Sequence, residues 1–403
     1  MSDFFAKRKL NDGSKTFKKT KSEFENNWVI HKSLLVYTSD AQPLKDFLKP
    51  YSKFAFFDLD HTLWKPKNAR KFHKDSEDWE YWHSIVPRKL KELSEEKTLI
   101  VVFSNQSGLL DPSNEKKCID FKRRCHLFSL SIGIPLIIFA ATDYDVFRKP
   151  VPGAFEYFQS FFEDKINLKD CCYVGDAAGR PEGWKTGKKA DFSDSDRKFA
   201  LNAGLKFKTP EEYFLNENPA PFKFKNFNPQ KFKNPEVLYI PSNTPLLSQS
   251  QEVIILVGFP ASGKTNFARS NLSDYVHDTL KTKSKCLALL KKSLEEGKSV
   301  VIDNTNLTID SRKEYLENVK RINDRISIRC FHFDVEESLY KHLNALRVIT
   351  QNANKISSIV YNKMKNTYVE PKIEEGFDEV RKILFKFQSD DPLKVKYFNM
   401  FLW

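Results

Sequence analysis

Two aspartates stand directly after a short apolar run, in the segment Asp58-Leu59-Asp60-His61-Thr62. The run itself, Phe54–Phe57, has the composition of a strand buried on both faces, so both carboxylates are expected where that strand ends. Two anions this close repel and raise a pKa unless a cation neutralises them. Mg²⁺ accepts such oxygen ligands, and one aspartate can then attack phosphorus while the other moves a proton. Taken alone, the motif also occurs as a capped surface turn, which explains about a third of such matches.

Three further apolar runs are each followed by a polar residue that suits the same chemistry. The residues are Ser104, Lys149 and Asp176, and the runs that precede them cover 99–103, 136–139 and 171–174. Because ligands collect at the carboxyl ends of parallel strands, we expect all three beside the aspartate pair. Ser104 would hold phosphate oxygens, Lys149 would stabilise a transferring phosphoryl group, and Asp176 would add a metal ligand. Singly, Ser104 is also explained as a helix cap and Lys149 as a surface lysine.

A second chemical motif follows the apolar run Val253–Val257. It reads Gly258-Phe259-Pro260-Ala261-Ser262-Gly263-Lys264-Thr265, the G-x-x-x-x-G-K-[ST] pattern of a P-loop between a strand and a helix. Gly258 and Gly263 would let backbone N–H groups surround the β- and γ-phosphates. Lys264 would supply positive charge, and Thr265 would offer its hydroxyl to Mg²⁺. The pattern predicts ATP binding.

Acidic and basic residues beyond the P-loop complete a candidate kinase site. Asp303 closes the next predicted strand and is expected to support the metal. Asp278 is placed to deprotonate an acceptor hydroxyl, although a helix N-cap explains it equally well. Arg312 and Arg347 fall in later helical stretches, where they would cover the γ-phosphate or lie on the surface.

Strands that alternate with helices predict two doubly wound α/β domains. We expect a basic flexible arm over residues 1–32, a first domain over 33–215, a Pro/Lys/Phe-rich connector over 216–250 and a second domain over 251–403. The arm is expected to be a nuclear-import signal, a nucleic-acid contact or a solvated tail. Interleaved Lys and Phe in the connector suit single-stranded nucleic acid, but we favour a strap whose rings pack on the neighbouring domain.

Composition narrows the class of protein. The chain has 403 residues, a formal charge of +13 and 40% hydrophobic residues, which excludes a mostly disordered chain and suggests a polyanionic partner. No apolar run approaches the roughly 20 residues needed to span a bilayer, and the N-terminus lacks a secretory signal. The six cysteines show neither metal-binding spacing nor a disulfide framework, which favours a reducing compartment.

The first set of motifs resembles, in chain order, the four motifs of haloacid-dehalogenase-type phosphatases. The resemblance implies that Asp58 is the nucleophile that forms an aspartyl-phosphate and that Asp60 is the general acid/base. It implies phosphate binding by Thr62, Ser104 and Lys149. It also implies Mg²⁺ binding by Asp58, Asp60 and Asp176, with Asp60 acting through its backbone carbonyl.

Two positions leave details of this resemblance open. Asp191, Asp194 and Asp196 compete for a later acidic position, and we favour Asp196 because the segment 196–204 resembles the closing helix of those phosphatases. His61 stands where glycine is commoner, so the geometry of this loop is uncertain.

The order of phosphatase, connector and P-loop kinase resembles the family of eukaryotic polynucleotide kinase 3′-phosphatases over roughly residues 33–403. Matching segments include GDAAGR, GFPASGKT, HDTL, IDNTN and EEGF. The resemblance implies removal of 3′-phosphates from DNA ends and transfer of the γ-phosphate of ATP to 5′-hydroxyls. It implies Asp278 as the kinase base, Lys264 and Thr265 as ATP–Mg²⁺ ligands and Arg347 as an aid to transfer. Ala345 stands where the family has an arginine, which leaves the lid in question.

Partners and alternatives follow from the same resemblance. Animal members carry an N-terminal forkhead-associated domain, for which the short basic segment leaves no room. We expect DNA ends as substrates, a repair-ligase complex as a further partner, no membrane, a monomer and a nuclear location. RNA-end healing, a non-catalytic DNA-binding scaffold and a metabolite kinase fused to a metabolite phosphatase are the alternatives, and the motifs do not separate DNA from RNA.

Overall fold

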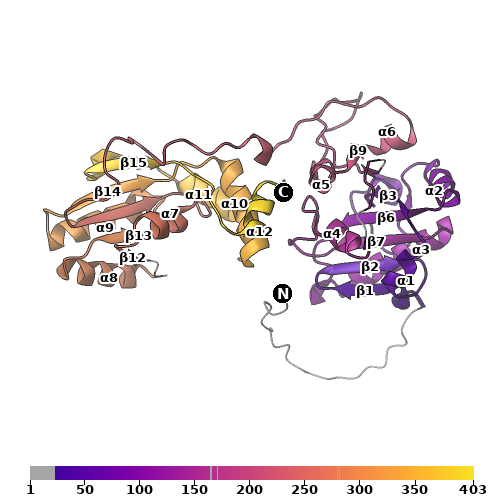
Figure 1. Ribbon diagram of the computed structural model, residues 1–403, viewed down its shortest axis with the longest axis horizontal. Coiled ribbons are helices and arrows are strands. Elements are labelled where there is room, and N and C mark those ends of the chain that lie inside the picture. Colours follow the sequence, from indigo (N-terminus) through magenta and orange to yellow (C-terminus); the bar gives the residue numbers. More distant parts are fainter. Residues whose placement is uncertain (1–22, 164–165, 170, 279, 281) are drawn as a thin grey trace, which may run out of the picture.

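Two α/β units lie side by side and are joined by an extended segment in the computed structural model (Figure 1). It describes residues 23–163, 166–169, 171–278, 280 and 282–403. Each unit is a largely parallel sheet with helices on both faces, which confirms the predicted pair of doubly wound α/β domains. Most of the expected basic arm falls on residues 1–22, outside the described residues.

The first sheet is built on five parallel strands, the central ones apolar on both faces, with two antiparallel strands added at one edge. In sheet order the strands are β1 (Trp28–His31), β2 (Leu34–Thr38), β7 (Leu136–Ala141), β6 (Thr98–Asn105), β3 (Lys53–Phe57), β8 (Cys172–Val174) and β9 (Lys206–Lys208). A small hairpin, β4 (Trp64–Lys65) with β5 (Glu80–Tyr81), lies apart from this sheet.

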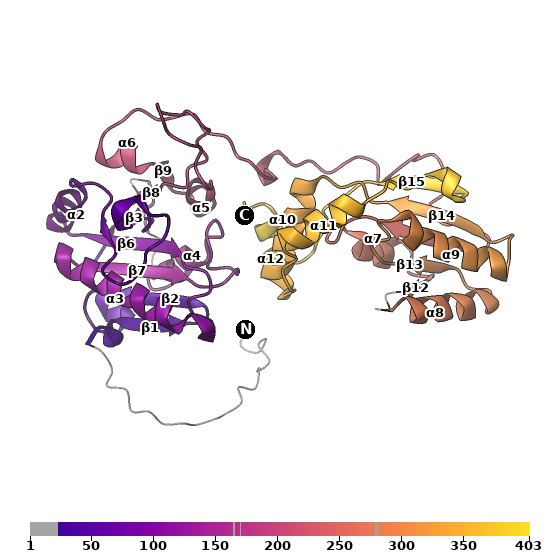
Figure 2. The same cartoon turned by 180° about the vertical axis from the view of Figure 1, so that it is seen from behind.

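Helices cover both faces of this sheet (Figure 2). They are α1 (Leu44–Leu48), α2 (Val86–Glu95), α3 (Glu115–Ile132), α4 (Gly153–Gln159), α5 (Ser195–Ala203) and α6 (Pro210–Phe214), with short 3₁₀ turns at Glu23–Asn27, Lys67–Ala69 and Pro112–Asn114. On one face, α2 and α3 pack against Phe57 and Val102. On the other, α1, α4 and α5 pack against Phe56 and Val101. Alternate residues of each strand therefore serve opposite cores.

The first sheet begins earlier than the predicted boundary at residue 33. Trp28 is buried, and its ring lies 5.1 Å from the ring of Tyr37 and 5.9 Å from that of Phe121. This aromatic packing holds β1 on the edge of the sheet. Val29 and Ile30 remain exposed, so the strand lacks the apolar continuity that marks the central strands.

The second sheet has five parallel strands and one antiparallel edge strand. In sheet order they are β10 (Tyr239–Ile240), β15 (Glu379–Ile383), β14 (Ser327–His332), β11 (Glu252–Val257), β13 (Val300–Ile302) and β12 (Val276–Asp278). The helices are α7 (Lys264–Asn271), α8 (Lys283–Glu295), α9 (Ile309–Ile322), α10 (Glu337–Gln351), α11 (Ser358–Thr367) and α12 (Pro392–Phe398), with 3₁₀ turns at Pro229–Lys231 and Ile373–Glu375. Helices α8 and α9 cover one face, and α7 covers the other.

The connecting segment packs aromatic rings on the C-terminal part of the second unit. The ring of Phe224 lies 5.0 Å from that of Phe401, and the ring of Phe232 lies 5.2 Å from that of Phe398. This packing supports the interpretation of the segment as a strap. The predicted connector also contains β10, which pairs with β15, so its C-terminal part belongs to the second sheet.

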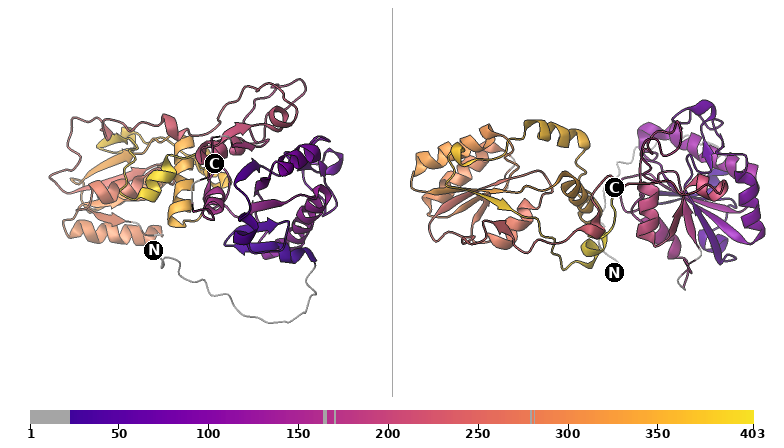
Figure 3. Two further views of the ribbon diagram at one scale, coloured as in Figure 1. Left: turned by 45° about the vertical axis from the view of Figure 1, so that its right-hand side comes forward. Right: turned by 90° about the horizontal axis from the view of Figure 1, so that it is seen from above.

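Helices α10 and α12 of the second unit face the first unit, as the two views of Figure 3 show. The Nζ of Lys198 donates to the carbonyl of Trp403 at 2.8 Å, and the amide of Asn202 donates to the carbonyl of Phe401 at 2.7 Å. Val151 joins an apolar cluster with Leu343. The described helices include none that is long and apolar enough to cross a membrane.

Candidate active sites

The predicted phosphatase residues meet at the carboxyl edge of the first sheet. Asp58 follows β3, Ser104 lies near the end of β6, and Asp176 follows β8. Lys149 comes from the loop after β7, and Asp196 from the first turn of α5. The parallel order of the strands brings these distant segments to one edge.

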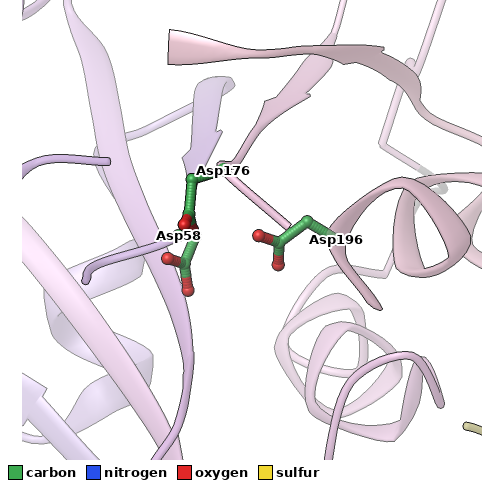
Figure 4. Close-up of side chains that lie close together, drawn as sticks. All are labelled: Asp58, Asp176 and Asp196. Atoms are coloured by element: carbon green, nitrogen blue, oxygen red, sulfur yellow. The ribbon is translucent and has the colours of Figure 1, made fainter. Parts of the chain in front are cut away.

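Three carboxylates form a compact acidic cluster at this edge (Figure 4). Oxygen atoms of Asp58, Asp176 and Asp196 lie within 4.8 Å of one another. The Nζ of Lys149 donates to Asp58 at 2.5 Å, to Asp196 at 2.7 Å and to the hydroxyl of Tyr173 at 2.8 Å. One buried cation is therefore shared by two members of a three-carboxylate group.

The acidic cluster carries more negative charge than Lys149 neutralises. Burial raises the pKa of Asp58 to about 7, although Lys149 opposes the shift. Burial, with the charges of Asp58 and Asp196, raises the pKa of Asp176 well above its ordinary value. The pKa of Lys149 is itself raised, because Asp196 and Asp58 outweigh the lowering by burial. A group of hard oxygen ligands with excess negative charge fits a divalent cation such as Mg²⁺.

The structure distinguishes the three candidates for the later acidic position. Asp196 belongs to the cluster and accepts a hydrogen bond from the backbone N–H of Ala177. Asp191 instead pairs with Arg180 at 2.9 Å, and Asp194 pairs with Lys198 at 2.9 Å. The geometry thus favours Asp196, and it gives the other two structural partners.

Asp60 lies beside the cluster, and its carboxylate is held by three side chains. Oδ1 accepts from the indole N–H of Trp64 at 2.7 Å and lies 3.1 Å from Nε2 of His73, and Oδ2 accepts from the amide of Gln106 at 2.6 Å. Burial raises the pKa of Asp60, but these hydrogen bonds and the charge of His73 outweigh it and lower the pKa to about 2. Because these three side chains occupy the Asp60 carboxylate, the backbone carbonyl of Asp60 stays the predicted metal ligand. Neither Trp64 nor His73 was predicted, because no spacing rule links them to Asp60.

Thr62 and Ser104 are both buried. The Oγ1 of Thr62 has no hydrogen-bond partner among the described residues, which suits an atom that meets a bound phosphate. The Oγ of Ser104 accepts from Gln106 at 2.9 Å. Asn105 holds the Lys149 backbone through hydrogen bonds to its N–H and its carbonyl, both at 2.9 Å. Asn105 therefore positions the lysine for the cluster.

His61 adopts a φ of 57°, in the left-handed region that favours glycine. Its N–H donates to the carbonyl of Trp64 at 2.7 Å, so the turn is closed in the usual way. The strain of a left-handed non-glycine residue is about 1–2 kcal/mol. This explains why glycine suits the position and shows that histidine preserves the turn.

The P-loop follows β11 and leads into α7. The Nζ of Lys264 donates to the carbonyls of Gly258 and Phe259, each at 2.8 Å, so the lysine lies inside its own loop. Burial lowers the pKa of Lys264 to about 8; the charge of Asp303 opposes the shift and that of Arg347 adds to it. The charges of Asp303 and Arg347 thus act on Lys264, while their roles as a metal support and a lid stay predictions. Thr265, in the first turn of α7, is exposed.

Asp278 ends β12 and is only 2% exposed. Its Oδ1 accepts from the N–H of Leu280 at 3.1 Å, whereas its Oδ2 has no hydrogen-bond partner among the described residues. A buried carboxylate oxygen without a partner is costly unless a ligand meets it. The arrangement suits a base that accepts a proton from a substrate hydroxyl.

Arg312 does not serve as a lid, contrary to one of the predictions. It is fully buried in α9, with Nε donating to Glu375 at 2.7 Å and Nη2 donating to the same carboxylate at 2.6 Å. The pair joins α9 to the EEGF segment, so both are structural. Ala345, on the same helix as Arg347, lines a cavity between the two units.

Comparisons with known proteins agree with this two-site arrangement. Residues 53–214 match the family described as polynucleotide kinase 3 phosphatase, and residues 253–371 match the AAA domain family. The chain is 37% identical to the bifunctional polynucleotide phosphatase/kinase of Schizosaccharomyces pombe, over 96% of this chain and 90% of that protein. It is 34% identical to a putative bifunctional polynucleotide phosphatase/kinase of Acanthamoeba polyphaga mimivirus, over 87% of this chain and 89% of that protein.

A single-function relative matches the first unit alone. The polynucleotide 3′-phosphatase of Saccharomyces cerevisiae is 31% identical over 39% of this chain and 85% of that protein. The first unit thus has a counterpart that occurs without the second, whereas the matches over most of the chain span both units. The chain belongs to the family of bifunctional polynucleotide phosphatase/kinases.

Proposed function

We propose that this enzyme prepares broken DNA for ligation by removing 3′-phosphates at one site and phosphorylating 5′-hydroxyls at the other. The observation that carries the proposal is that two clusters of residues suited to phosphoryl transfer lie in separate sheets. One combines the acidic cluster with Lys149, and the other combines the P-loop with the buried Asp278.

The phosphatase reaction begins with Asp58. Its carboxylate attacks the phosphorus of the 3′-phosphate, the bond from phosphorus to the 3′-oxygen breaks, and Asp60 gives that oxygen a proton. Asp60 is ionised in the free enzyme and takes up this proton as the phosphate dianion enters and raises its pKa. A water molecule then attacks the aspartyl-phosphate, Asp60 takes its proton, and inorganic phosphate leaves.

The residues that would hold Mg²⁺ at this site are Asp58, Asp176 and the backbone carbonyl of Asp60, with Asp196 completing the acidic cluster. When bound, the ion supplies charge neutralisation for the carboxylates and the phosphate oxygens. Lys149 adds a fixed positive charge next to Asp58, and Thr62 and Ser104 offer hydroxyls to the phosphate.

The kinase reaction uses the P-loop unit with ATP as phosphate donor. Asp278 takes the proton of the 5′-hydroxyl, the 5′-oxygen attacks the γ-phosphorus, and the bond to the β–γ bridging oxygen breaks to release ADP. Lys264 and Arg347 balance the negative charge of the phosphates. The Thr265 hydroxyl and Asp303 are the residues that would hold Mg²⁺ there.

Exposed aromatic side chains support a polynucleotide as the phosphatase substrate. Phe72 is 74% exposed and precedes His73, the partner of Asp60; Phe192 is 93% exposed and follows Asp191. The Nζ of Lys71 lies 5.4 Å from the centroid of each ring. Two rings that flank a cation suit unpaired bases and a phosphate backbone, which a small metabolite would not require.

The setting of the enzyme follows from the same activity. We propose that it acts in the nucleus as a monomer, with a DNA-repair ligase complex as partner, because a ligase joins the 5′-phosphate and 3′-hydroxyl that the two sites produce. The net charge of +13 would hold the polyanionic substrate.

Turnover on matched DNA and RNA ends tests the substrate class. Strands of one sequence, each with a 5′-hydroxyl and a 3′-phosphate, are supplied with ATP and Mg²⁺, and both ends are followed over time. We expect faster processing of DNA at both ends. Faster processing of RNA at both ends would favour RNA-end healing over DNA repair. No turnover of either the DNA or the RNA strand would favour a non-catalytic DNA-binding scaffold.

A further inference from the structure

A cavity of about 180 Å³ lies between the two units, outside both catalytic centres. The first unit contributes the segment 144–151, and the second contributes α10, α11, the residues between them and the C-terminal Leu402 and Trp403. Its wall is largely apolar, with Val151, Ile349, Ile356 and Leu402 among the lining residues. The volume and the wall suit a planar, mostly apolar group such as a nucleobase.

Two cations from different units meet at the rim of this cavity over one tyrosine ring. The Nζ of Lys355 lies 3.4 Å from the ring centroid of Tyr144, and the guanidinium carbon of Arg148 lies 4.4 Å from the same centroid. Tyr144 is 47% exposed. The cation–π contacts hold both positive groups in place, although like charges repel.

Neither rim cation is held in a direct ion pair. Within the described part of the chain, neither Lys355 nor Arg148 forms an ion pair, whereas Lys341 on the same rim pairs with Glu337 at 2.6 Å. Asp143 lies near enough to act on both cations, and Asp145, which lines the cavity, acts on Arg148. Asp145 also accepts hydrogen bonds from the hydroxyl of Ser33 and from the N–H of Phe147. The rim thus presents two positive groups that no direct ion pair engages, which suits a phosphate.

Both catalytic centres border this cavity. Lys149, whose Nζ bonds to Asp58, is one of its lining residues, and Arg148 donates to the hydroxyl of Ser107, which follows the Asp60 partner Gln106. On the other side, the hydroxyl of Tyr361 donates to the P-loop carbonyl of Pro260 at 3.2 Å. A strand that leaves the phosphatase site towards the second unit would cross this rim.

We propose that the cavity is a nucleotide-binding subsite, composed from both units, for the strand whose 3′ end occupies the phosphatase site. Arg148 and Lys355 bind a phosphate of that strand, and the base enters the apolar cavity. The proposal rests on the proposed 3′-phosphatase function and adds that the kinase unit supplies part of the phosphatase substrate site.

The small side chain of Ala345 leaves space in the cavity for a base. It lines the cavity with a single methyl group. A longer side chain there would occupy the space that the base needs.

The test measures 3′-phosphate release from single strands of two lengths. One is a dinucleotide, and the other has about ten nucleotides, enough to cover an extended binding site. For Lys355→Ala we expect KM on the longer strand to rise roughly three- to tenfold with kcat unchanged, because one phosphate contact is lost. KM on the dinucleotide should not change, and Lys355→Arg should restore the wild-type value.

Two further variants keep the test decisive. Ala345→Leu, which fills the cavity without changing charge, should also raise KM on the longer strand alone. The control is Lys292→Ala, an exposed lysine on α8 at the end of the kinase unit away from the phosphatase unit (Figure 1), which should behave as wild type.

Wild-type KM on the longer strand in both Lys355→Ala and Ala345→Leu would overturn the subsite. So would a rise in KM that is equal for both strand lengths, since that is the mark of a structural effect on the phosphatase site. If the wild-type enzyme releases no phosphate from either strand, the 3′-phosphatase function itself is wrong, and the subsite is refuted with it.

Discussion

At the scale of single residues, the carboxylates of the phosphatase site fall into two environments. Asp58 and Asp176 are buried together, and burial raises the pKa of each. Asp60 is stabilised as an anion by Trp64, His73 and Gln106. Neighbouring carboxylates with opposite pKa shifts suit different tasks, a nucleophile that needs a cation and a group that exchanges protons.

His73 is the partner of Asp60 that most directly tests this division. Replacing it by alanine removes one of three contacts that orient the Asp60 carboxylate, so proton transfer in both steps of the phosphatase reaction becomes less efficient. We expect kcat for 3′-phosphate release to fall about tenfold in His73→Ala with KM little changed. His73→Gln, which keeps a hydrogen-bond donor, should recover much of the loss. Unchanged kcat in His73→Ala would show that Trp64 and Gln106 suffice.

Asp278 carries the corresponding prediction for the kinase. Asp278→Asn preserves the shape of the side chain but removes the carboxylate that would take the hydroxyl proton. The rate of 5′-phosphorylation should fall by about two orders of magnitude or more, while KM for ATP stays near the wild-type value. Phosphatase activity of the same preparation provides the control for folding. A kinase rate near that of the wild-type enzyme would assign Asp278 to structure alone.

At the scale of elements, the central strands could be predicted because a parallel strand buried on both faces is a continuous apolar run. The polar residues at the ends of those runs then predicted both sites. The edge strand β1 escaped prediction because Val29 and Ile30 are exposed, and β10 because it has two residues.

Contacts between residues that are far apart in the sequence could not be predicted in this way. Arg312 resembles a surface or lid arginine in the sequence, and its partner Glu375 is 63 residues away. The contact of His73 with Asp60 is likewise visible only in the fold, because the loop that carries His73 returns to Asp60. A pattern of spacing and hydropathy cannot show either pairing, since both depend on how separate segments come together in space.

The packing of α10 against α12 carries a prediction about pH. Burial lowers the pKa of His342 to about 4, and its Nε2 lies 3.0 Å from the carbonyl of Phe398. The unfolded chain binds a proton at this residue between pH 6.5 and 4, whereas the folded protein does not, so stability falls as the pH falls through that range. The loss should be about 2 kcal/mol at pH 5.

Thermal unfolding of wild type and His342→Asn at pH 7.5 and pH 5 measures this effect. The substitution removes the titrating group, so any stability advantage of the wild type at pH 7.5 should shrink at pH 5. An advantage that is the same at both pH values would show that His342 does not titrate differently in the folded and unfolded states.

At the scale of the whole molecule, two sites that handle the two ends of one substrate are held in a fixed relation by the strap and by α10 and α12. The groups proposed to carry out each reaction lie at the edge of one sheet, so the two chemistries should be separable by substitution. The interdomain cavity adds a shared surface through which the kinase unit contributes to strand binding at the phosphatase site.

The most direct test of two independent phosphoryl-transfer sites is a pair of substitutions assayed on one strand with a 5′-hydroxyl and a 3′-phosphate, in the presence of ATP and Mg²⁺. Asp58→Ala should retain 5′-phosphorylation and lose 3′-phosphate release, and Lys264→Ala should do the reverse. Release of 3′-phosphate by Asp58→Ala at the wild-type rate, or loss of both activities from either substitution in a folded protein, would contradict the account.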